Sequence, residues 1–362
     1  MRSVTSSARL INWVLTVPWP RRWLLAREPK LLKGVLRVAL RRIARWYRQR
    51  SGLDGRTGGV TVVQRFGSAL GLNIHFHVLM LDGVYQDRDA TLPFVTVPPP
   101  STDEVAVLVE DIATRVERWL CKAGYGGEER DAHEEEEDLQ SLIQSASVQG
   151  RIGLGKYRGQ KSRRVQWLSG KAFTLPPQCA TFEGYNLHAG VEIAAWHRPG
   201  LEQLCRYVLR PPLAKTRLSE TSDGGVEMQL KRAWSDGTTS LRFTALELVE
   251  KLAALVPPPR KNQVFYHGVL GARSKWRSRI VPGTSPAEVG APSRRITKKP
   301  ASTTSRHVPW EQLLRRTFGV FGWMCAKCGG FLELRAVVLG GPESRKILES
   351  MARSARGPPD SP

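Results

Sequence analysis

The sequence predicts an α+β fold, because strand patterns and helical patterns occur along the same chain of 362 residues. Two runs rich in β-branched and aromatic residues, 61–66 and 73–83, flank the glycine-bearing loop 67–71 and are typical of a β-hairpin. From Pro29 to residue 50, apolar residues recur at helical spacing and basic residues occupy much of the remaining surface. Strands and helices are therefore both expected within one folded region.

Two capping boxes mark the starts of further helices. Ser101 with Glu104 precedes an apolar stripe that runs to about residue 121, and Thr244 with Glu247 precedes a helix that the prolines at 257–259 end. Further strand patterns lie at 182–195, 226–231 and 239–243.

The largest compositional signal is charge. The chain has a formal net charge of +22, and so large a basic excess favours a polyanionic partner, most often nucleic acid. Its five scattered cysteines argue against a disulfide framework, and no apolar run is long enough to cross a bilayer. The N-terminal residues lack the apolar core of a signal peptide, so we expect a cytoplasmic protein with no membrane partner.

The hairpin carries a pattern that can bind a metal ion. Because strand side chains alternate, His75 and His77 share one face, and Gln64 on the partner strand can face them across the ladder. Two imidazoles and an amide oxygen make half of a divalent-metal shell, with positions left for substrate oxygens. The alternative is that two strand histidines are simply half-buried and hydrogen-bonded.

A tyrosine far along the chain changes that balance. Pro199 begins a helix that the prolines at 211–212 end, and Tyr207 lies at the edge of its apolar stripe, beside Gln203 and Arg210. A hydroxyl can cleave a phosphodiester covalently while a cation neutralises the phosphate oxygens. A tyrosine phenol also benefits from a nearby positive charge that favours phenolate, so Arg210 is a candidate catalytic residue beside Tyr207. His188, in the strand 182–195, is either a third histidine near this site or an ordinary packed residue.

At these residues the sequence resembles the HUH-endonuclease transposases of bacterial rolling-circle insertion sequences, and most of all the common-region elements. The likeness extends over roughly residues 10–340, and its motifs are NIHFH at 73–77, RYVLRPPLA at 206–214, KRAWSDGT at 231–238 and YHGVL at 266–270. The resemblance implies a central antiparallel sheet with flanking helices, Mg²⁺ or Mn²⁺ on His75 and His77, and Tyr207 as nucleophile. The implied product is a 5′-phosphotyrosine link to single-stranded DNA with a free 3′-hydroxyl.

Two departures from the family pattern define the type. Many relatives carry two tyrosines four residues apart, whereas Gln203 takes the earlier position here, which makes the chain a single-tyrosine type. The cysteine-rich N-terminal zinc module of the family is not found in the sequence. Gln64 as third metal ligand is an inference from strand geometry, and Gln203 and His188 remain the alternatives.

Several basic segments are predicted to contact DNA. They are the helix at 29–50, the strand end before the turn at 235–238, and the run after the YHGVL motif. The residues predicted to bind DNA are Arg37, Arg41, Arg45, Lys231, Arg232, Arg273, Lys275 and Arg277.

The chain divides by composition into five regions. The predicted regions are a basic helical N-terminal segment (1–57), a nuclease core with an acidic insertion near 128–138 (58–281), a basic Pro/Ser/Thr linker (282–309), a small C-terminal module (310–352) and a disordered tail (353–362). Cys325 and Cys328 in the C-terminal module are half of a zinc ribbon, and zinc there would need a further ligand such as His307. The alternative is a small cap that binds no metal.

The predicted function is therefore that of a transposase that nicks and rejoins single-stranded DNA, in a bacterial cytoplasm and close to the nucleoid. The first alternative is a shortened, catalytically impaired transposase derivative that only binds DNA. A replication initiator or relaxase with the same chemistry is the second. The sequence leaves the DNA ends, the identity of the ion and the oligomeric state open.

Overall fold

The computed structural model describes residues 8–88, 91–126, 138–166, 175–234, 236–281 and Lys346. All of these except Lys346 belong to a compact unit within residues 1–290. The predicted linker, the C-terminal module with Cys325 and Cys328, the tail, and almost all of the acidic insertion lie outside the described residues. The predicted division into domains therefore stays a prediction.

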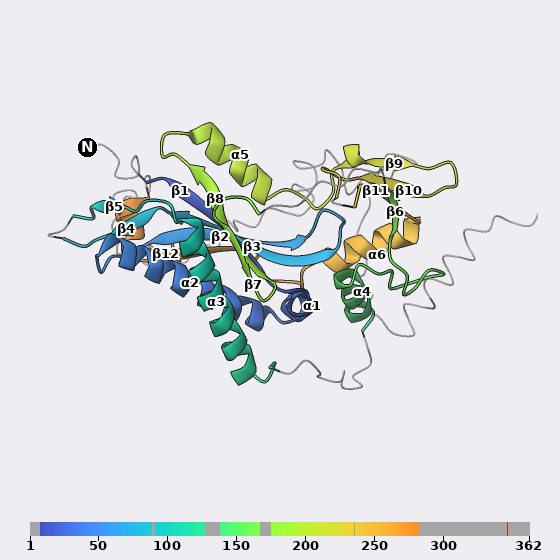
Figure 1. Ribbon diagram of the computed structural model, residues 1–362, viewed down its shortest axis with the longest axis horizontal. Helices are drawn as coiled ribbons and strands as arrows, with labels where there is room; N and C mark the ends of the chain where they lie inside the picture. The colour runs from blue at the N-terminus through green and yellow to red at the C-terminus, as the bar shows by residue number, and fades with distance from the viewer. Residues whose placement is uncertain are drawn as a thin grey trace, which may run out of the picture. The chain divides into compact units, whose positions relative to one another are not determined.

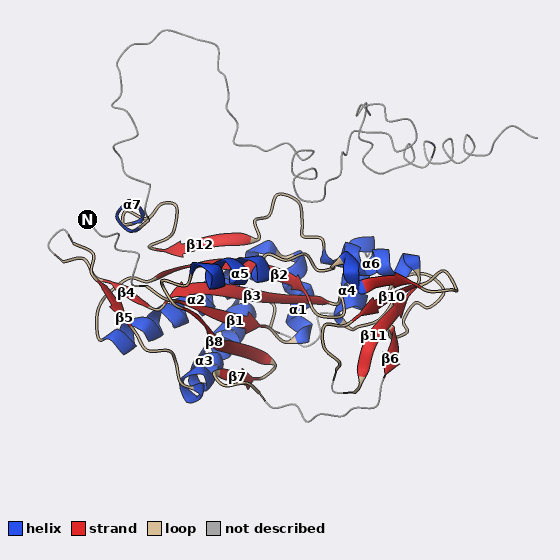
Figure 2. Cartoon of the chain, turned by 90° about the horizontal axis from the view of Figure 1, so that it is seen from above, coloured by secondary structure: helices blue, strands red, loops and turns tan. Residues whose placement is uncertain are grey.

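A six-stranded antiparallel sheet lies at the centre of the described fold (Figures 1 and 2). Its strand order is β12-β2-β3-β1-β8-β7, and the hairpin β2–β3 is the pair predicted from the two flanking runs. The strands are β1 (Leu10–Thr16), β2 (Gly58–Phe66), β3 (Leu72–Leu81), β7 (Cys179–Phe182), β8 (Tyr185–Ile193) and β12 (Val264–Gly268).

Helices cover both faces of this sheet. α1 (Trp19–Arg27), α2 (Pro29–Ser51) and α3 (Thr102–Lys122) lie on one face, and α5 (Arg198–Val208) lies on the other (Figure 1). The main core lies under the first group, where the buried Trp13 of β1 donates a hydrogen bond from Nε1 to the hydroxyl of Tyr47 in α2 at 3.2 Å. Among the described residues, no helix is long and apolar enough to span a membrane.

A second, four-stranded sheet packs with two further helices. Its order is β6-β11-β10-β9, with bounds β6 (Arg163–Gln166), β9 (Leu218–Glu220), β10 (Val226–Gln229) and β11 (Thr238–Phe243). The helices are α4 (Leu139–Val148) and α6 (Ala245–Leu255), and the short 3-10 helix η2 (Lys215–Arg217) leads from α5 into β9. Smaller elements are β4 (Gly83–Tyr85), β5 (Phe94–Thr96) and α7 (Arg277–Ile280).

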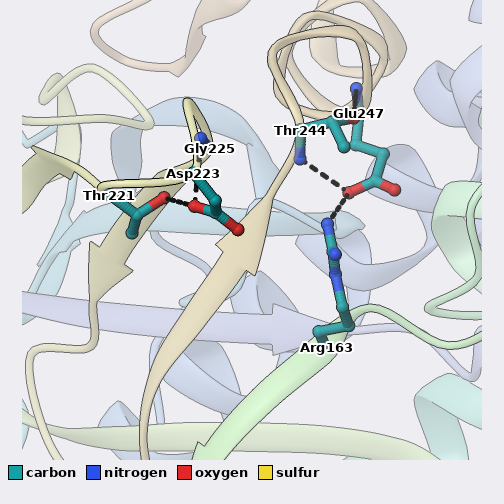
Figure 3. Close-up of polar contacts among 6 residues, drawn as sticks. All are labelled: Arg163, Thr221, Asp223, Gly225, Thr244 and Glu247. Carbon is teal, nitrogen blue, oxygen red and sulfur yellow. Dashed lines mark hydrogen bonds and ion pairs between the residues drawn. The ribbon is translucent and has the colours of Figure 1, made fainter.

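Side-chain contacts fix the ends of these elements (Figure 3). Thr244 and Glu247 form the predicted capping box at the start of α6, and Arg163 of β6 reaches the same carboxylate at 3.3 Å. In the turn between β9 and β10, the hydroxyl of Thr221 donates to Asp223. Glu247 therefore links α6 to β6, the edge strand of this sheet.

The predicted α+β class with a central antiparallel sheet is confirmed, and so are the helices at 29–50 and 101–121. Two local predictions differ from the structure. The strand expected at 182–195 is β8, which begins only at Tyr185, because Gly184 adopts a φ of +78° in the tight turn after the preceding strand β7. Within the predicted helical segment 1–57, residues 10–16 instead form β1, which pairs with β3 and β8 inside the sheet.

Gly34 sets how closely α2 approaches α3. Intrinsic helix propensity would make Gly34→Ala stabilising by about 1 kcal/mol. A methyl group at this position would, however, overlap the ring of Trp119 in α3. We therefore expect Gly34→Ala to lower the free energy of unfolding by about 1–3 kcal/mol in urea titrations. Adding Trp119→Leu to the variant should recover part of the loss, and a more stable Gly34→Ala would contradict this packing.

Candidate active site

Packing of α5 on the sheet places Tyr207 over the hairpin. The apolar side of the helix, with Leu204 and Val208, is buried against Val62 of β2 and Leu79 of β3. Tyr207 is next to Val208 on the helix, so it lies at the edge of this contact and remains 46% exposed. A solvent-accessible phenol is thus held by a helix that is itself anchored on the sheet.

The two histidines lie beneath this tyrosine. In the ladder, Gln64 of β2 is opposite His75 and Val14 of β1 is opposite His77. The ring centroids of His75 and His77 are 5.1 Å apart, and the centroids of His77 and Tyr207 are 5.9 Å apart in an edge-on arrangement. The structure thus brings together three predicted site residues from β3 and α5, more than a hundred residues apart in the chain.

Burial keeps both imidazoles neutral. Desolvation lowers the pKa of His75, partly offset by a hydrogen bond to the Asn73 carbonyl and reinforced by the charge of Arg210. Desolvation, the neighbouring His75 and Arg210 together lower the pKa of His77 to about 3. At neutral pH each ring therefore has one N–H and one free lone pair.

His75 and Gln64 turn two acceptor atoms toward each other. The Nδ1 of His75 lies 2.9 Å from the carbonyl oxygen of Asn73, the shorter of the two contacts that the ring makes with an acceptor oxygen, which favours Nδ1 as the site of the single proton of the neutral ring. The amide nitrogen of Gln64 donates to the carbonyl oxygen of Val208 at 2.6 Å, which turns its Oε1 to within 3.2 Å of His75 Nε2. Two lone pairs with no proton between them suit a shared cation.

This donor set fits a divalent metal ion. Two neutral imidazoles and one amide oxygen supply three ligands without cancelling the charge of the ion. Within the part of the chain that the structure describes, no group of three or more His, Cys, Asp or Glu side chains is placed to bind a metal. The amide oxygen of Gln64, 3.2 Å from His75 Nε2, is placed where it could serve as a third ligand.

Asn12 of β1 is a site residue that the sequence analysis missed. Its buried side-chain amide lies beside His77, with Nδ2 3.4 Å from Nδ1, and its Oδ1 has no hydrogen-bond partner. Rotating the amide by 180° lets Oδ1 accept from His77 Nδ1–H and leaves Nε2 free as a ligand. The available signal was a polar residue inside the apolar run 10–16.

Arg210 lies over the tyrosine ring from beyond the helix. The sequence placed Arg210 on the same helix as Tyr207, but α5 ends at Val208 and Arg210 follows it. Its guanidinium carbon lies 4.4 Å from the ring centroid of Tyr207 and 5.8 Å from that of Phe66. A permanent positive charge is therefore held between two aromatic rings at the site.

The two alternative ligands lie further away. His188 of β8 is on the same face as His77, but Val14 of β1 lies between them in the ladder, which separates them by two strand spacings, about 10 Å. Burial lowers the pKa of His188. Gln203 is exposed one helical turn before Tyr207. Neither has a recorded contact with His75 or His77 among the described residues.

The predicted DNA-binding residues of α2 form a row on the opposite side of the sheet. Arg37, Arg41 and Arg45 are exposed at intervals of one turn. A groove of about 330 Å³ lies between α2 and β12, with Lys33, Arg37 and Arg41 on its lining beside the ring of Phe265. Positive charge and an aromatic ring therefore meet in one groove.

The other predicted DNA-binding residues lie in loops. Lys231 and Arg232 are exposed in the connection between β10 and β11, and Arg273 and Lys275 are exposed after β12. Arg277, at the start of α7, instead stacks on an exposed tyrosine ring of β12 at 5.5 Å. These cations do not form one continuous surface with α2.

Comparison with known proteins gives one match. The model of the family described as "Putative transposase" (Y2_Tnp) matches residues 58–277, more than half of the chain. No curated protein and no solved structure matches the chain. The matched range contains β2, β3 and α5, and hence His75, His77 and Tyr207, whereas Asn12 lies outside it. The chain belongs to this transposase family, whose members act on DNA.

Proposed function

We propose that the protein nicks and rejoins single-stranded DNA through a covalent bond to Tyr207, as the transposase of a rolling-circle insertion sequence. The observation that carries this proposal is the placement of a half-exposed phenol 5.9 Å, ring to ring, from His77, above the facing acceptors of His75 and Gln64. A tyrosine that only fills the core would be buried, whereas Tyr207 is at the exposed edge of its helix. A purely structural histidine would have no reason to turn an unprotonated ring nitrogen toward the amide oxygen of Gln64.

The chemistry follows from these groups. The Tyr207 oxygen forms a bond to phosphorus in line with the 3′ oxygen, the P–O3′ bond breaks, the 3′ oxygen leaves as a hydroxyl after taking up a proton, and the phenol proton passes to water. The reverse reaction with another 3′-hydroxyl rejoins the strand. His75, His77 and Gln64 would hold Mg²⁺ or Mn²⁺, which when bound neutralises charge on the scissile phosphate.

Single-stranded DNA is the proposed substrate because aromatic and basic side chains alternate at the grooves. The groove lined by Lys33, Arg37 and Arg41 also presents the Phe265 ring, on which a splayed base could stack. An attack on a phosphodiester also needs a strand whose backbone can bend to bring a phosphate to the exposed phenol of Tyr207. A DNA substrate further implies a location near the nucleoid.

The proposal predicts covalent capture of DNA. A pool of random-sequence single strands with a 3′ label should become attached to the wild-type chain in Mn²⁺, as a band that survives SDS, and EDTA should abolish the band. The same pool with a 5′ label should release labelled fragments with a 3′-hydroxyl instead. Electrophoresis and phosphoamino-acid analysis provide the measurement.

The same assay separates the alternatives. A wild-type chain that binds the pool in a salt-dependent manner, yet forms no covalent band with either metal, would instead be the impaired, DNA-binding derivative. A replication initiator or relaxase would give the same band and differ only in the DNA ends it selects.

A further inference from the structure

Three cations gather where α5 leads into the second sheet. Arg210 follows α5, Arg217 ends η2, and Lys231 follows β10. We propose that Arg210, Arg217 and Lys231 form a binding site for one backbone phosphate of the strand that Tyr207 attacks. This inference rests on the proposed function, because it takes the phosphate to belong to a DNA strand.

Two buried N–H groups in this cluster lack acceptors. Arg210 Nε and Arg217 Nη2 are both shielded from solvent and have no hydrogen-bond partner in the part of the chain that the structure describes. An unsatisfied buried donor on a charged group costs more than the roughly 1–3 kcal/mol of a neutral one, so such groups are normally paired. Both donors are on guanidinium groups close enough to interact electrostatically, so one acceptor with several oxygens could satisfy them.

The cluster also lacks negative charge. None of the three side chains forms an ion pair with a carboxylate among the described residues. Burial and the charge of Arg210 lower the pKa of Arg217, and burial, Arg210 and Arg217 lower that of Lys231. Like charges are thus held close together with nothing inside the described fold to compensate them.

Local contacts hold the three cations in place. The guanidinium of Arg210 is held by contacts with two aromatic rings, its carbon lying 4.4 Å from the ring centroid of Tyr207 and 5.8 Å from that of Phe66. Arg217 donates from Nε to the carbonyl oxygen of Gln229 at 2.7 Å, two residues before Lys231. This hydrogen bond joins η2 to the end of β10, so two of the three cations lie in segments that adjoin strands of the second sheet.

Phosphate matches these features better than a carboxylate does. It offers several oxygens to converging N–H donors, and arginine forks bind it by two parallel hydrogen bonds. The position next to Tyr207 places the anion on the path of a strand whose neighbouring phosphodiester reaches the phenol. Residues beside the four-stranded sheet would then bind the DNA strand, while Tyr207 above the six-stranded sheet attacks it.

The test is equilibrium binding without cleavage. Fluorescence anisotropy of a labelled single-stranded oligonucleotide would be measured in EDTA at several NaCl concentrations with the full chain. Arg217→Gln should weaken binding about tenfold, because a hydrogen bond to a charged group is lost. The slope of log K against log [NaCl] should fall by about 0.7, the value for one phosphate contact with a single strand. Inorganic phosphate should compete with the oligonucleotide for the wild-type chain and less so for this variant.

Matched variants keep the result readable. Arg242→Gln removes an arginine of β11 in the same sheet that is already paired with Glu227 at 3.3 Å, and it should leave affinity and slope unchanged. Lys231→Gln, at an exposed position, should weaken binding several-fold. If Arg217→Gln shows no melting transition by circular dichroism and is therefore unfolded, the result for Lys231→Gln tests the phosphate site in its place. Unchanged affinity and slope in the folded Arg217 and Lys231 variants would overturn the phosphate site. Because the assay contains no metal, absence of covalent capture in the wild-type chain would overturn the proposed function and leave this result standing.

Discussion

Tyr207→Phe is expected to abolish covalent capture of DNA while leaving the fold intact. The substitution removes one oxygen atom from a side chain that is 46% exposed, and the described structure records no hydrogen bond from that hydroxyl. The ring that contacts His77 and Arg210 remains. Loss of a covalent nucleophile lowers turnover by several orders of magnitude, so we expect less than about a thousandth of the wild-type band.

The matched control is Tyr266→Phe. Tyr266 is likewise exposed, at 55%, and stands on β12 at the edge of the same sheet, under the guanidinium of Arg277. This variant should form the covalent band at the wild-type rate. Both variants should bind the oligonucleotide in EDTA with wild-type affinity. An undiminished band in Tyr207→Phe would show that another residue bonds to the DNA.

The parts of the site that the sequence predicted are those governed by local geometry. Alternation along one strand puts His75 and His77 on one face, and a short hairpin loop brings Gln64 opposite them, so three neighbours follow from about fifteen residues. Likewise, the helical period alone places Tyr207 at the edge of the apolar side of α5. Each of these depends on a repeat of two or 3.6 residues and on little else.

What the sequence did not predict depends on distant pairing. Asn12 lies beside His77 only because β1 pairs with β3 on one side and β8 on the other. No pattern within residues 10–16 predicts which strands will be the partners. Within the described residues, the N–H groups of Arg210 and Arg217 that lack acceptors exist only after folding, and no spacing in the sequence reveals them. The sequence predicted that Arg210 lies on the same helix as Tyr207, but α5 ends at Val208. The long side chain of Arg210 nevertheless reaches the ring of Tyr207.

The second large effect is expected from the histidines. His77→Ala or His75→Ala should reduce the affinity for Mn²⁺ by more than about a hundredfold, measured by calorimetry on the DNA-free chain. Residues that only support metal ligands typically change affinity 10–100-fold, so the ligands themselves should exceed that range. Gln64→Leu should cost less, because an amide oxygen is the weakest of the three donors. His267→Ala should retain affinity, since the imidazole of His267 is hydrogen-bonded to Thr61 Oγ1 at 2.9 Å.

Thermal unfolding gives a readout of the same site that does not involve DNA. An ion that binds only the folded chain stabilises it by about 2.7 kcal/mol at a hundred times its dissociation constant, so Mn²⁺ should raise the wild-type melting temperature. The rise should vanish in His77→Ala and His75→Ala and persist in His267→Ala. Equal rises in all four proteins would place the ion elsewhere. In that case the contact between His75 Nε2 and Gln64 Oε1 would be an ordinary hydrogen bond of the other neutral tautomer, in which Nε2 carries the proton.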